Sequence, residues 1–283
     1  MKNIELATAL KEFEQENQSK RLSSATVRYY RSFIGQFMRW LPETGDAPII
    51  AADLFKGYKA HLSESKANSI SVNTNLRAVR RFFNFCIERE YCLPFKMKLL
   101  REERHIKQTF SKDEIGKIFK YEDPSCRESV IAVLLLSTGV RSASLRSVMV
   151  RDVSFGDDLI FFRHSKNKEE FSLPIPNGVS QLLEKYIAVH KLSESAWLFP
   201  NAAGNRFDDV GLNRFTARYL EQIGINKKGI HIFRHTFARS LIENGCDAIT
   251  LMRCLNHKSI RQSEQYVALY GRDLRFAVEK YNP

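Results

Sequence analysis

The sequence has few of the features that mark membrane-spanning, disulfide-bonded or zinc-binding proteins. Its longest purely apolar run, Val130–Leu136, has seven residues, whereas a membrane-spanning helix needs roughly twenty. Its five cysteines are an odd number, and none forms a C-x-x-C pair of the kind that holds zinc. No signal-peptide pattern opens the chain. We therefore expect reduced thiols, no metal site and no membrane, in a cytoplasmic protein.

Acidic residues are also in deficit. The 44 lysines and arginines outnumber the 32 aspartates and glutamates, which gives a net charge of +12 and a pI of about 9.5. This surplus favours a polyanionic partner, and nucleic acid is the usual one. Hydrophobic residues make up 43% of the chain and include 20 phenylalanines, so packed cores are expected rather than disorder. The length of 283 residues suits two domains.

The first part of the chain, residues 1–93, predicts a helical domain. Apolar residues recur at three- and four-residue steps from Val27 behind Ser23, and again from Val72 behind Ser71. The second of these predicted helices carries a cluster of three arginines, Arg77, Arg80 and Arg81. Such a cluster is either a solvated face or a set of contacts to DNA phosphates, and the sequence alone leaves both readings open.

The apolar period then stops. Residues 94–109 contain Pro94 and a series of basic residues, which predicts a linker between two domains. A basic linker suits a strap that lies across DNA phosphates. Its predicted phosphate contacts are Lys96, Lys98, Arg101 and Lys107, with Arg104 among the same charges.

The remaining residues, 110–283, predict a second domain that is mostly helical. Ser111 and Glu114 have the capping-box spacing, and an apolar helix over 128–137 stops at Gly139. Two short apolar segments, 158–163 and 170–175, flank a polar tip and predict a β-hairpin. The pattern is mostly helical again from Asn177 onward, with a loop over 200–206.

Six residues of this second domain form one ordered series. Arg141 ends a T-G-x-R segment, and Lys166 lies at the hairpin tip. His231 and Arg234 belong to an H-x-x-R-H-T segment, His257 ends an L-N-H segment, and Tyr266 follows nine residues later. Each residue by itself is most often structural. Together, in this order and at these spacings, they predict a phosphoryl-transfer site with a tyrosine nucleophile.

On these motifs the chain resembles the tyrosine recombinase, or phage integrase, family over nearly its whole length. The resemblance implies a mainly α fold, in which a helical, SAM-like core-binding domain precedes a mostly α catalytic domain with a small β-hairpin. The chain is similar in size to the Xer-like and transposon-encoded members of the family. Two positions depart from the family pattern: Ser144 stands where a glutamate is usual, and Asn256 replaces the glycine of L-G-H.

The resemblance also implies roles for the six residues. Arg141, Arg234 and His257 would bind the phosphate, because preorganised donors stabilise its charge in the transition state. Tyr266 would attack the phosphorus, with His231 as proton acceptor and Lys166 as the acid for the leaving 5′ oxygen. The product would be a 3′-phosphotyrosine, which stores the bond energy for rejoining. No metal and no other cofactor is therefore expected.

The implied partners are double-stranded DNA and further copies of the chain. Two protomers would bind inverted half-sites, two such pairs would form a homotetramer, and an accessory DNA-bending or regulatory protein is a further candidate. The protein would act at the nucleoid. The C-terminal tail, with Leu274, Phe276 and Val278, would dock on a neighbouring protomer or pack on its own domain.

Several alternatives stay open. Tyr270 rivals Tyr266, Lys168 rivals Lys166, and His235 is interpreted as structural. A type IB topoisomerase would use the same phosphotyrosine chemistry without exchanging partners. A DNA-binding architectural factor that has lost catalysis is the second alternative, although all six positions hold competent residue types.

Overall fold

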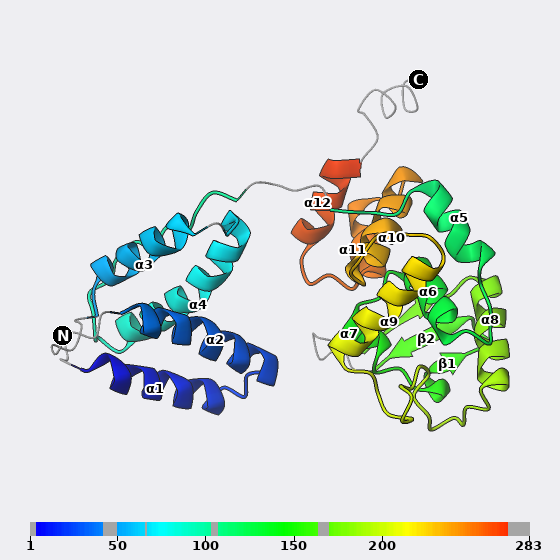
Figure 1. Cartoon of the computed structure of the whole chain (residues 1–283), viewed down its shortest axis with the longest axis horizontal. Coiled ribbons are helices and arrows are strands. Elements are labelled where there is room, and N and C mark those ends of the chain that lie inside the picture. Colours follow the sequence, from blue (N-terminus) through cyan, green and yellow to red (C-terminus); the bar gives the residue numbers. More distant parts are fainter. Residues whose placement is uncertain (1–3, 42–49, 66, 103–106, 164–169, 271–283) are drawn as a thin grey trace, which may run out of the picture. The chain divides into compact units, whose positions relative to one another are not determined.

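The computed structural model describes residues 4–41, 50–65, 67–102, 107–163 and 170–270. The chain divides into two compact units, residues 1–105 and 106–283 (Figure 1). Lys166 and Lys168, Arg104 and the C-terminal tail lie outside the described residues. In the described part of the chain no helix is long and apolar enough to cross a membrane.

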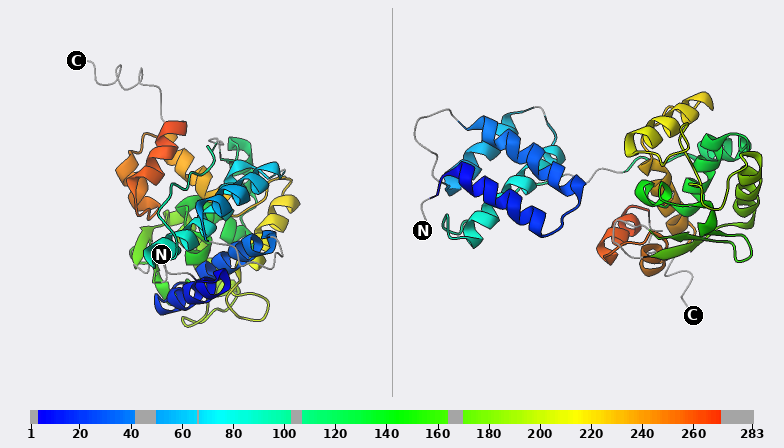
Figure 2. Two further views of the ribbon diagram at one scale, coloured as in Figure 1. Left: turned by 90° about the vertical axis from the view of Figure 1, so that its left-hand side faces the viewer. Right: turned by 90° about the horizontal axis from the view of Figure 1, so that it is seen from below.

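The described residues of the first unit form four helices. They are α1 (Leu6–Ser19), α2 (Ser24–Trp40), α3 (Ala52–Glu64) and α4 (Ser69–Glu88). Helix α4 contacts the other three (Figures 1 and 2). Its buried face meets an aromatic-rich core, in which Phe13 packs edge-on against both Phe82 and Phe85. A helix this apolar on one face gains most of its stability from such burial rather than from propensity.

The helix starts follow from side-chain caps. Ser23 accepts a hydrogen bond from the main-chain N–H of Thr26 and begins α2, as predicted. The predicted start of α4 at Ser71 is wrong, because Asn68 provides the capping oxygen and accepts from the N–H of Ser71 itself. The helix therefore begins at Ser69, and Ser71 lies within its first turn.

Residues 94–102 of the predicted linker fold with the first unit. Phe95, Met97, Leu99 and Leu100 pack against its core. The Asn73 side chain exchanges two hydrogen bonds with the main chain of Leu100, at 2.9 and 2.8 Å. The stretch thus has apolar anchors without helical period, while its basic residues Lys96, Lys98 and Arg101 are exposed.

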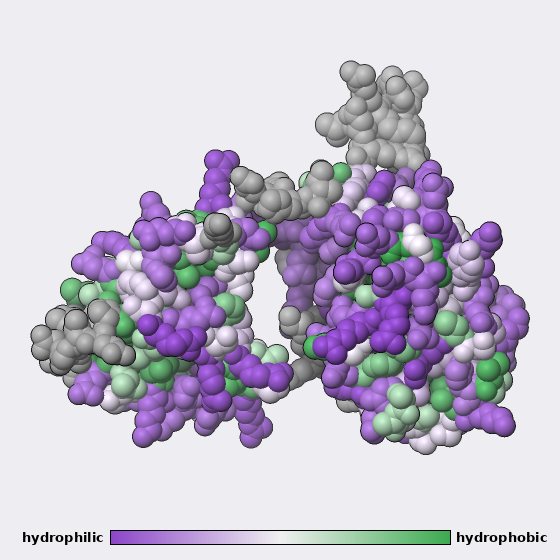
Figure 3. Space-filling view, in the orientation of Figure 1, coloured by the Kyte–Doolittle hydropathy of each residue, from purple (hydrophilic) through white to green (hydrophobic). Residues whose placement is uncertain are grey.

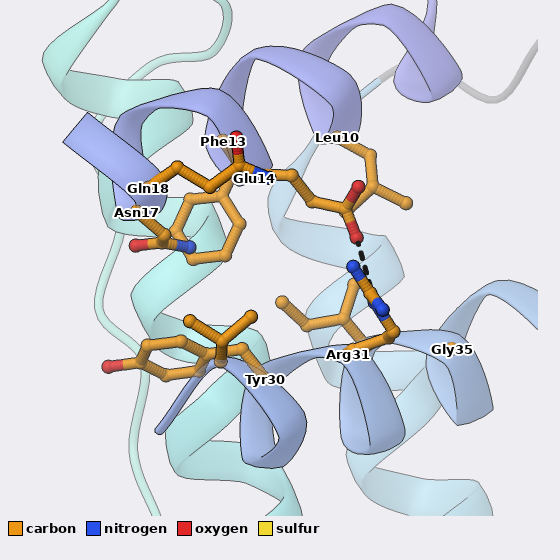
Figure 4. A pocket seen from close by; sticks show the side chains of 10 residues that line it. Leu10, Phe13, Glu14, Asn17, Gln18, Tyr30, Arg31 and Gly35 are labelled. Atoms are coloured by element: carbon orange, nitrogen blue, oxygen red, sulfur yellow. Dashed lines mark ion pairs between the residues drawn. The ribbon is translucent and has the colours of Figure 1, made fainter. Parts of the chain in front are cut away.

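A small apolar cavity of about 130 Å³ lies between α1 and α2. Figure 4 shows its wall, where Glu14 and Arg31 form an ion pair of 3.6 Å beside Phe13 and Tyr30. The described residues that line it include no histidine, lysine or cysteine. The only carboxylate among the described residues of this lining, Glu14, is paired with Arg31, so we assign the cavity no catalytic role.

The second unit is built around α6 (Arg127–Thr138), which is buried along most of its length. The helices around it are α5 (Lys112–Lys120), α8 (Asn177–Val189), α9 (Asp209–Gln222) and α10 (His231–Glu243), and all four contact α6. The capping box at the start of α5 is present, with Ser111 and Glu114 each bonded to the other's main chain. The predicted capping box at the start of α5 is thus confirmed.

A small antiparallel sheet of three strands packs into this core. Its strands are β1 (Val153–Ser154), β2 (Leu159–Phe162) and β3 (Phe171–Pro174), in the order β1-β2-β3. Ile160 pairs with Leu173, and both face the core. The two predicted strands are confirmed, and a two-residue strand and a short 3₁₀ turn (Val150–Asp152) precede them.

The last helices form a second, smaller cluster. Helices α11 (Ala248–Cys254) and α12 (Ile260–Tyr270) pack with α10 around Ala238, Leu251 and Tyr266. A four-residue helix α7 (Ser142–Leu145) follows α6. The fold is thus mainly α, as the sequence predicts, and hydrophilic side chains cover most of the visible face of each unit (Figure 3).

Gly139 fixes the geometry where α6 ends. Its φ of 60° lies in the left-handed region, and a Cβ there would collide with the ring of Phe237 on α10. Both constraints require glycine. The close approach of α6 and α10 at this point brings Arg141 and Arg234 into one neighbourhood.

Candidate active site

Five of the six predicted site residues line a single pocket of about 210 Å³ in the second unit. They come from separate segments: Arg141 follows α6, His231 and Arg234 lie on α10, His257 lies between α11 and α12, and Tyr266 lies on α12. Lys166, the sixth, is outside the described residues. The full lining is Lys107, Arg141, His231, Arg234, His235, His257, Gln262, Gln265 and Tyr266.

The two arginines are held by main-chain carbonyls. Arg141 donates to the carbonyls of Leu255 (3.3 Å) and Asn256 (2.8 Å), and Arg234 donates to those of Gly139 (2.8 Å) and Leu255 (2.7 Å). Gly139 and Leu255 are the C-caps of α6 and α11, so the negative ends of two helix dipoles face the guanidinium groups. The helix ends thus orient both cations without neutralising them.

The pocket carries a surplus of positive charge among the residues that the structure describes. No carboxylate is among the described residues that line it. Arg234 is only 7% exposed, and burial together with Arg141 lowers its pKa to about 9. Burial also lowers the pKa of Arg141. A buried pair of like charges is stabilised by an anion, and the planar guanidinium donors match phosphate oxygens.

Tyr266 is almost fully buried, and its hydroxyl has a defined partner. It is 3% exposed and lies 2.6 Å from Nδ1 of His235. Burial raises the pKa of Tyr266, while burial and then the charge of Lys107 lower the pKa of His235 to about 4. At neutral pH the tyrosine is therefore protonated and donates to a neutral imidazole.

His235 thus lines the pocket, although its sequence context predicts a structural residue. His231, the predicted proton acceptor, lines the same pocket, and the rings of His231 and His235 are 6.5 Å apart. The i, i+4 spacing of these two histidines on α10 places them on one helix face, and this spacing was the available signal.

His257 packs directly against the nucleophile candidate. Its ring stacks on that of Tyr266 with centroids 6.4 Å apart, and its Nδ1 lies 2.9 Å from the hydroxyl of Ser263. Burial and Arg234 lower the pKa of His257 to about 4, so it is neutral at pH 7. Asn256 beside it has a φ of 46°, the left-handed geometry that asparagine tolerates better than most residues.

The rival tyrosine is engaged elsewhere. Tyr270 donates from its hydroxyl to the main-chain carbonyl of Lys107 at 3.2 Å, and it does not line the pocket. This geometry favours Tyr266 over Tyr270 as the nucleophile.

Two of the predicted DNA-contacting arginines of the first unit have acidic partners. Arg77 pairs with Glu102 at 2.5 Å, and Arg81 pairs with Glu88 at 3.2 Å and more loosely with Glu16. Arg80 is half-buried on the same helix. Contacts of these arginines, and of Lys96, Lys98 and Arg101, with DNA stay predictions.

Lys107 differs from the other predicted DNA contacts, because it lines the pocket of the second unit. Its ammonium lies 4.9 Å from the centre of the Tyr266 ring. No sequence signal distinguishes it from the other lysines of the predicted linker.

Among the described residues, no cluster of histidine, cysteine, aspartate and glutamate could hold a metal ion.

Two family models match the chain. The phage integrase family model matches residues 108–272, and the model of the phage integrase N-terminal SAM-like domain matches residues 10–90. The chain therefore belongs to the phage integrase family. This membership makes it an enzyme of the tyrosine site-specific recombinase class.

Individual relatives are distant but cover nearly the whole chain. Tyrosine recombinase XerA of Pyrococcus horikoshii is 26% identical, over 96% of this chain and 92% of its own length. Tyrosine recombinase XerC of Syntrophus aciditrophicus is 24% identical, over 97% of each chain.

Solved structures share the fold. The Tn1549 transposon integrase in complex with transposon right end DNA has a TM-score of 0.79 at 16% identity, over 99% of this chain and 100% of its own. A lambda integrase dimer bound to a core site has a TM-score of 0.72 at 19% identity, over 95% of this chain and 98% of its own.

Proposed function

We propose that the protein cuts and rejoins duplex DNA at a short core site with inverted half-sites, through a 3′-phosphotyrosine intermediate on Tyr266. The observation that carries this proposal is the buried Tyr266 hydroxyl in one pocket with two arginines, a pocket that no carboxylate of the described residues lines. A phosphodiester would bring the missing negative charge to these arginines and its phosphorus to the phenol.

The proposed cleavage step is a balanced displacement. The Tyr266 oxygen forms a bond to phosphorus, and the bond from phosphorus to the 5′ oxygen breaks. Arg141, Arg234 and His257 bind the non-bridging oxygens as their charge shifts. A histidine takes the phenolic proton, and Lys166 gives a proton to the leaving 5′ oxygen. Attack by a 5′ hydroxyl from another strand reverses each transfer and rejoins the DNA without a cofactor.

The proposed assembly follows the same chemistry. Exchange of strands between two duplexes needs four active sites, so we propose a homotetramer formed from two DNA-bound dimers. The lambda integrase is seen as a tetramer bound to a Holliday junction, which supports this assembly. An accessory DNA-bending or regulatory protein and action at the nucleoid belong to the same proposal.

Covalent capture tests the reaction. Wild-type protein is incubated with randomised duplexes that carry a nick, so that the short 5′-hydroxyl fragment diffuses away after cleavage and the adduct persists. We expect a denaturant-resistant adduct that maps to Tyr266. Tyr266→Phe, which lacks only the attacking oxygen, should bind the selected duplex and form no adduct, whereas the matched control Tyr270→Phe should form one.

An adduct on Tyr270, or one that persists in Tyr266→Phe, would contradict the assignment. Absence of any adduct with the wild-type protein would favour the silent DNA-binding factor. Relaxation of supercoiled plasmids that lack the selected site, without strand exchange, would favour the topoisomerase.

The proton acceptor can be tested on the same duplex. His235 holds the phenolic hydroxyl at 2.6 Å, so we expect His235→Gln to slow single-turnover cleavage by about 10² or more. The sequence assigns this role to His231, which makes His231→Gln the matched comparison. A larger loss in His231→Gln, with near wild-type cleavage in His235→Gln, would return the role to His231.

A further inference from the structure

Lys107 is fixed to the second unit although it lies at the end of the predicted linker. Its carbonyl accepts from Tyr270 on α12, and the carbonyl of Thr109 accepts from Lys227 at 2.8 Å. The main-chain N–H of Phe110 donates to the hydroxyl of Thr236 on α10 at 2.9 Å. Residues 107–110 are thus tied to the helices that carry the site, and the position of Lys107 is set by those helices.

The ammonium of Lys107 lies inside the pocket. It is 4.9 Å from the centre of the Tyr266 ring, and the Lys107 side chain lines the same cavity as Arg141 and Arg234. The face of a tyrosine ring attracts a cation, which explains how the ammonium is held there. No carboxylate lines this cavity among the described residues, so the structure offers Lys107 no acidic partner in the pocket.

The charges around Lys107 are unfavourable without a ligand. Burial and then the charge of Arg234 lower the pKa of Lys107, and Lys107 in turn lowers the pKa of His231, His235 and His257. Three cations therefore converge on one small pocket beside three histidines. An anion bound within this pocket would relieve their mutual repulsion.

We propose that Lys107 is a phosphate-binding catalytic residue, a third cation that contacts a non-bridging oxygen of the phosphate attacked by Tyr266. This inference rests on the proposed function and goes beyond it, since Lys107 lies outside the motifs that define the site. The proposal gives Lys107 a different role from that of Lys96, Lys98 and Arg101, which would contact only the DNA backbone on either side of the cleaved phosphate. A lysine suits this task as a compact charge with three donors that can follow the oxygen as its charge grows.

The test compares single-turnover cleavage by Lys107→Ala, Lys107→Arg and the control Lys112→Ala, on the duplex selected by covalent capture. Lys112 is exposed at the start of α5, so its removal should leave the rate unchanged. Lys107→Ala should cleave about 10- to 100-fold more slowly, as expected for loss of one charge-assisted donor, and should bind the duplex nearly as well. Lys107→Arg keeps the charge and should cleave faster than Lys107→Ala.

Two modified duplexes identify the atom that Lys107 contacts. A methylphosphonate at the scissile position removes the negative charge, so the difference between wild type and Lys107→Ala should largely disappear. A bridging 5′-phosphorothiolate has a better leaving group, so it should rescue Lys166→Ala and leave Lys107→Ala slow. Thermal unfolding of each variant checks the fold, and Lys107→Gln provides a second neutral variant should Lys107→Ala be unstable.

Three outcomes would overturn the proposal. They are wild-type cleavage by Lys107→Ala, an undiminished defect on the methylphosphonate, and rescue of Lys107→Ala by the phosphorothiolate, which would make Lys107 the acid instead. Each of these requires an adduct with wild-type protein, so each leaves the proposed function standing. Absence of the wild-type adduct would remove both proposals together.

Discussion

Two arginines of the first unit and two arginines of the candidate site have different partners. In the first unit Arg77 and Arg81 pair with the carboxylates of Glu102 and Glu88 near the surface. In the second unit Arg141 and Arg234 donate to main-chain carbonyls inside a pocket. The first two arginines are therefore paired with carboxylates, whereas no carboxylate among the described residues lines the pocket around Arg141 and Arg234.

This difference separates two ways in which a basic protein can meet DNA. An exposed ion pair contributes little, so a phosphate can replace its carboxylate at small cost. A buried arginine held by carbonyls has already lost much of its hydration, and an incoming anion gains the full interaction. We therefore expect the first unit to supply adjustable affinity and the second to supply a preorganised charge for the reaction.

The largest expected effect is on the buried arginine. Arg234→Ala should slow cleavage of the bound, selected duplex by about 10² to 10³, as for loss of a preorganised transition-state donor. The matched change in the first unit, Arg81→Ala, should leave the cleavage rate at saturating protein unchanged. Single-turnover rates for both variants measure this contrast.

Arg234→Lys sharpens the same comparison. It keeps the charge and loses the paired planar donors, so it should recover only part of the rate. A cleavage defect in Arg81→Ala as large as in Arg234→Ala would remove the proposed division of labour between the two units.

A second contrast is in the pH at which each unit loses stability. In the second unit the pKa values of His235 and His257 are lowered to about 4 from an ordinary value of 6.5. The cause is burial, together with the charge of Lys107 for His235 and the charge of Arg234 for His257. The unfolded chain binds these protons first, so stability should fall as the pH drops from about 6.5 to about 4. In the first unit, the hydrogen bond from Lys20 lowers the pKa of Glu16 from its ordinary value of 4.5. The ionised Glu16 therefore loses its contribution to the stability of the first unit only as the pH falls below 4.5.

The two tryptophans report each unit separately, since Trp40 lies in the first and Trp197 in the second. Urea midpoints of Trp197→Phe and Trp40→Phe should therefore respond differently between pH 6.5 and 4.5, with the larger fall in the second unit. Replacing His235 and His257 by glutamine should flatten that fall. Parallel behaviour of the two units would contradict this explanation.

Local sequence patterns predicted those parts of the fold that neighbouring residues determine. The capping box at Ser111, the end of α6 at Gly139 and the two longer strands all depend on side chains a few residues apart. The motif spacing also predicted the gathering of Arg141, Arg234 and Tyr266, because the family resemblance carries long-range information that periodicity does not.

Contacts between distant segments were not predictable in this way. The bond between His235 and Tyr266 joins residues 31 positions apart, and it depends on how α10 meets α12. Lys107 reaches the pocket only because residues 107–110 are bonded to α10 and α12. Leu100 packs on the first unit through Asn73, although the sequence around it has no apolar period.

The smallest expected effect is on two arginines of α4, Arg77 and Arg80. If Arg77 and Arg80 exchange their present surroundings for DNA phosphates, each lost contact should lower the log–log salt slope of binding by roughly 0.9. Changing both to alanine should therefore flatten the slope by about 1–2 and weaken selected and unselected duplexes alike. Titrations at several salt concentrations measure this slope.

Two controls determine whether the effect belongs to this cluster. Glu102→Gln releases Arg77 from its carboxylate, so it should tighten binding slightly and leave the slope as it is, because the phosphate contact itself is retained. Arg31→Ala removes another exposed arginine of the first unit, which pairs with Glu14 on the wall of the apolar cavity. Equal flattening by Arg31→Ala would mean that the first unit attracts DNA through its overall charge, and that Arg77 and Arg80 hold no particular phosphates.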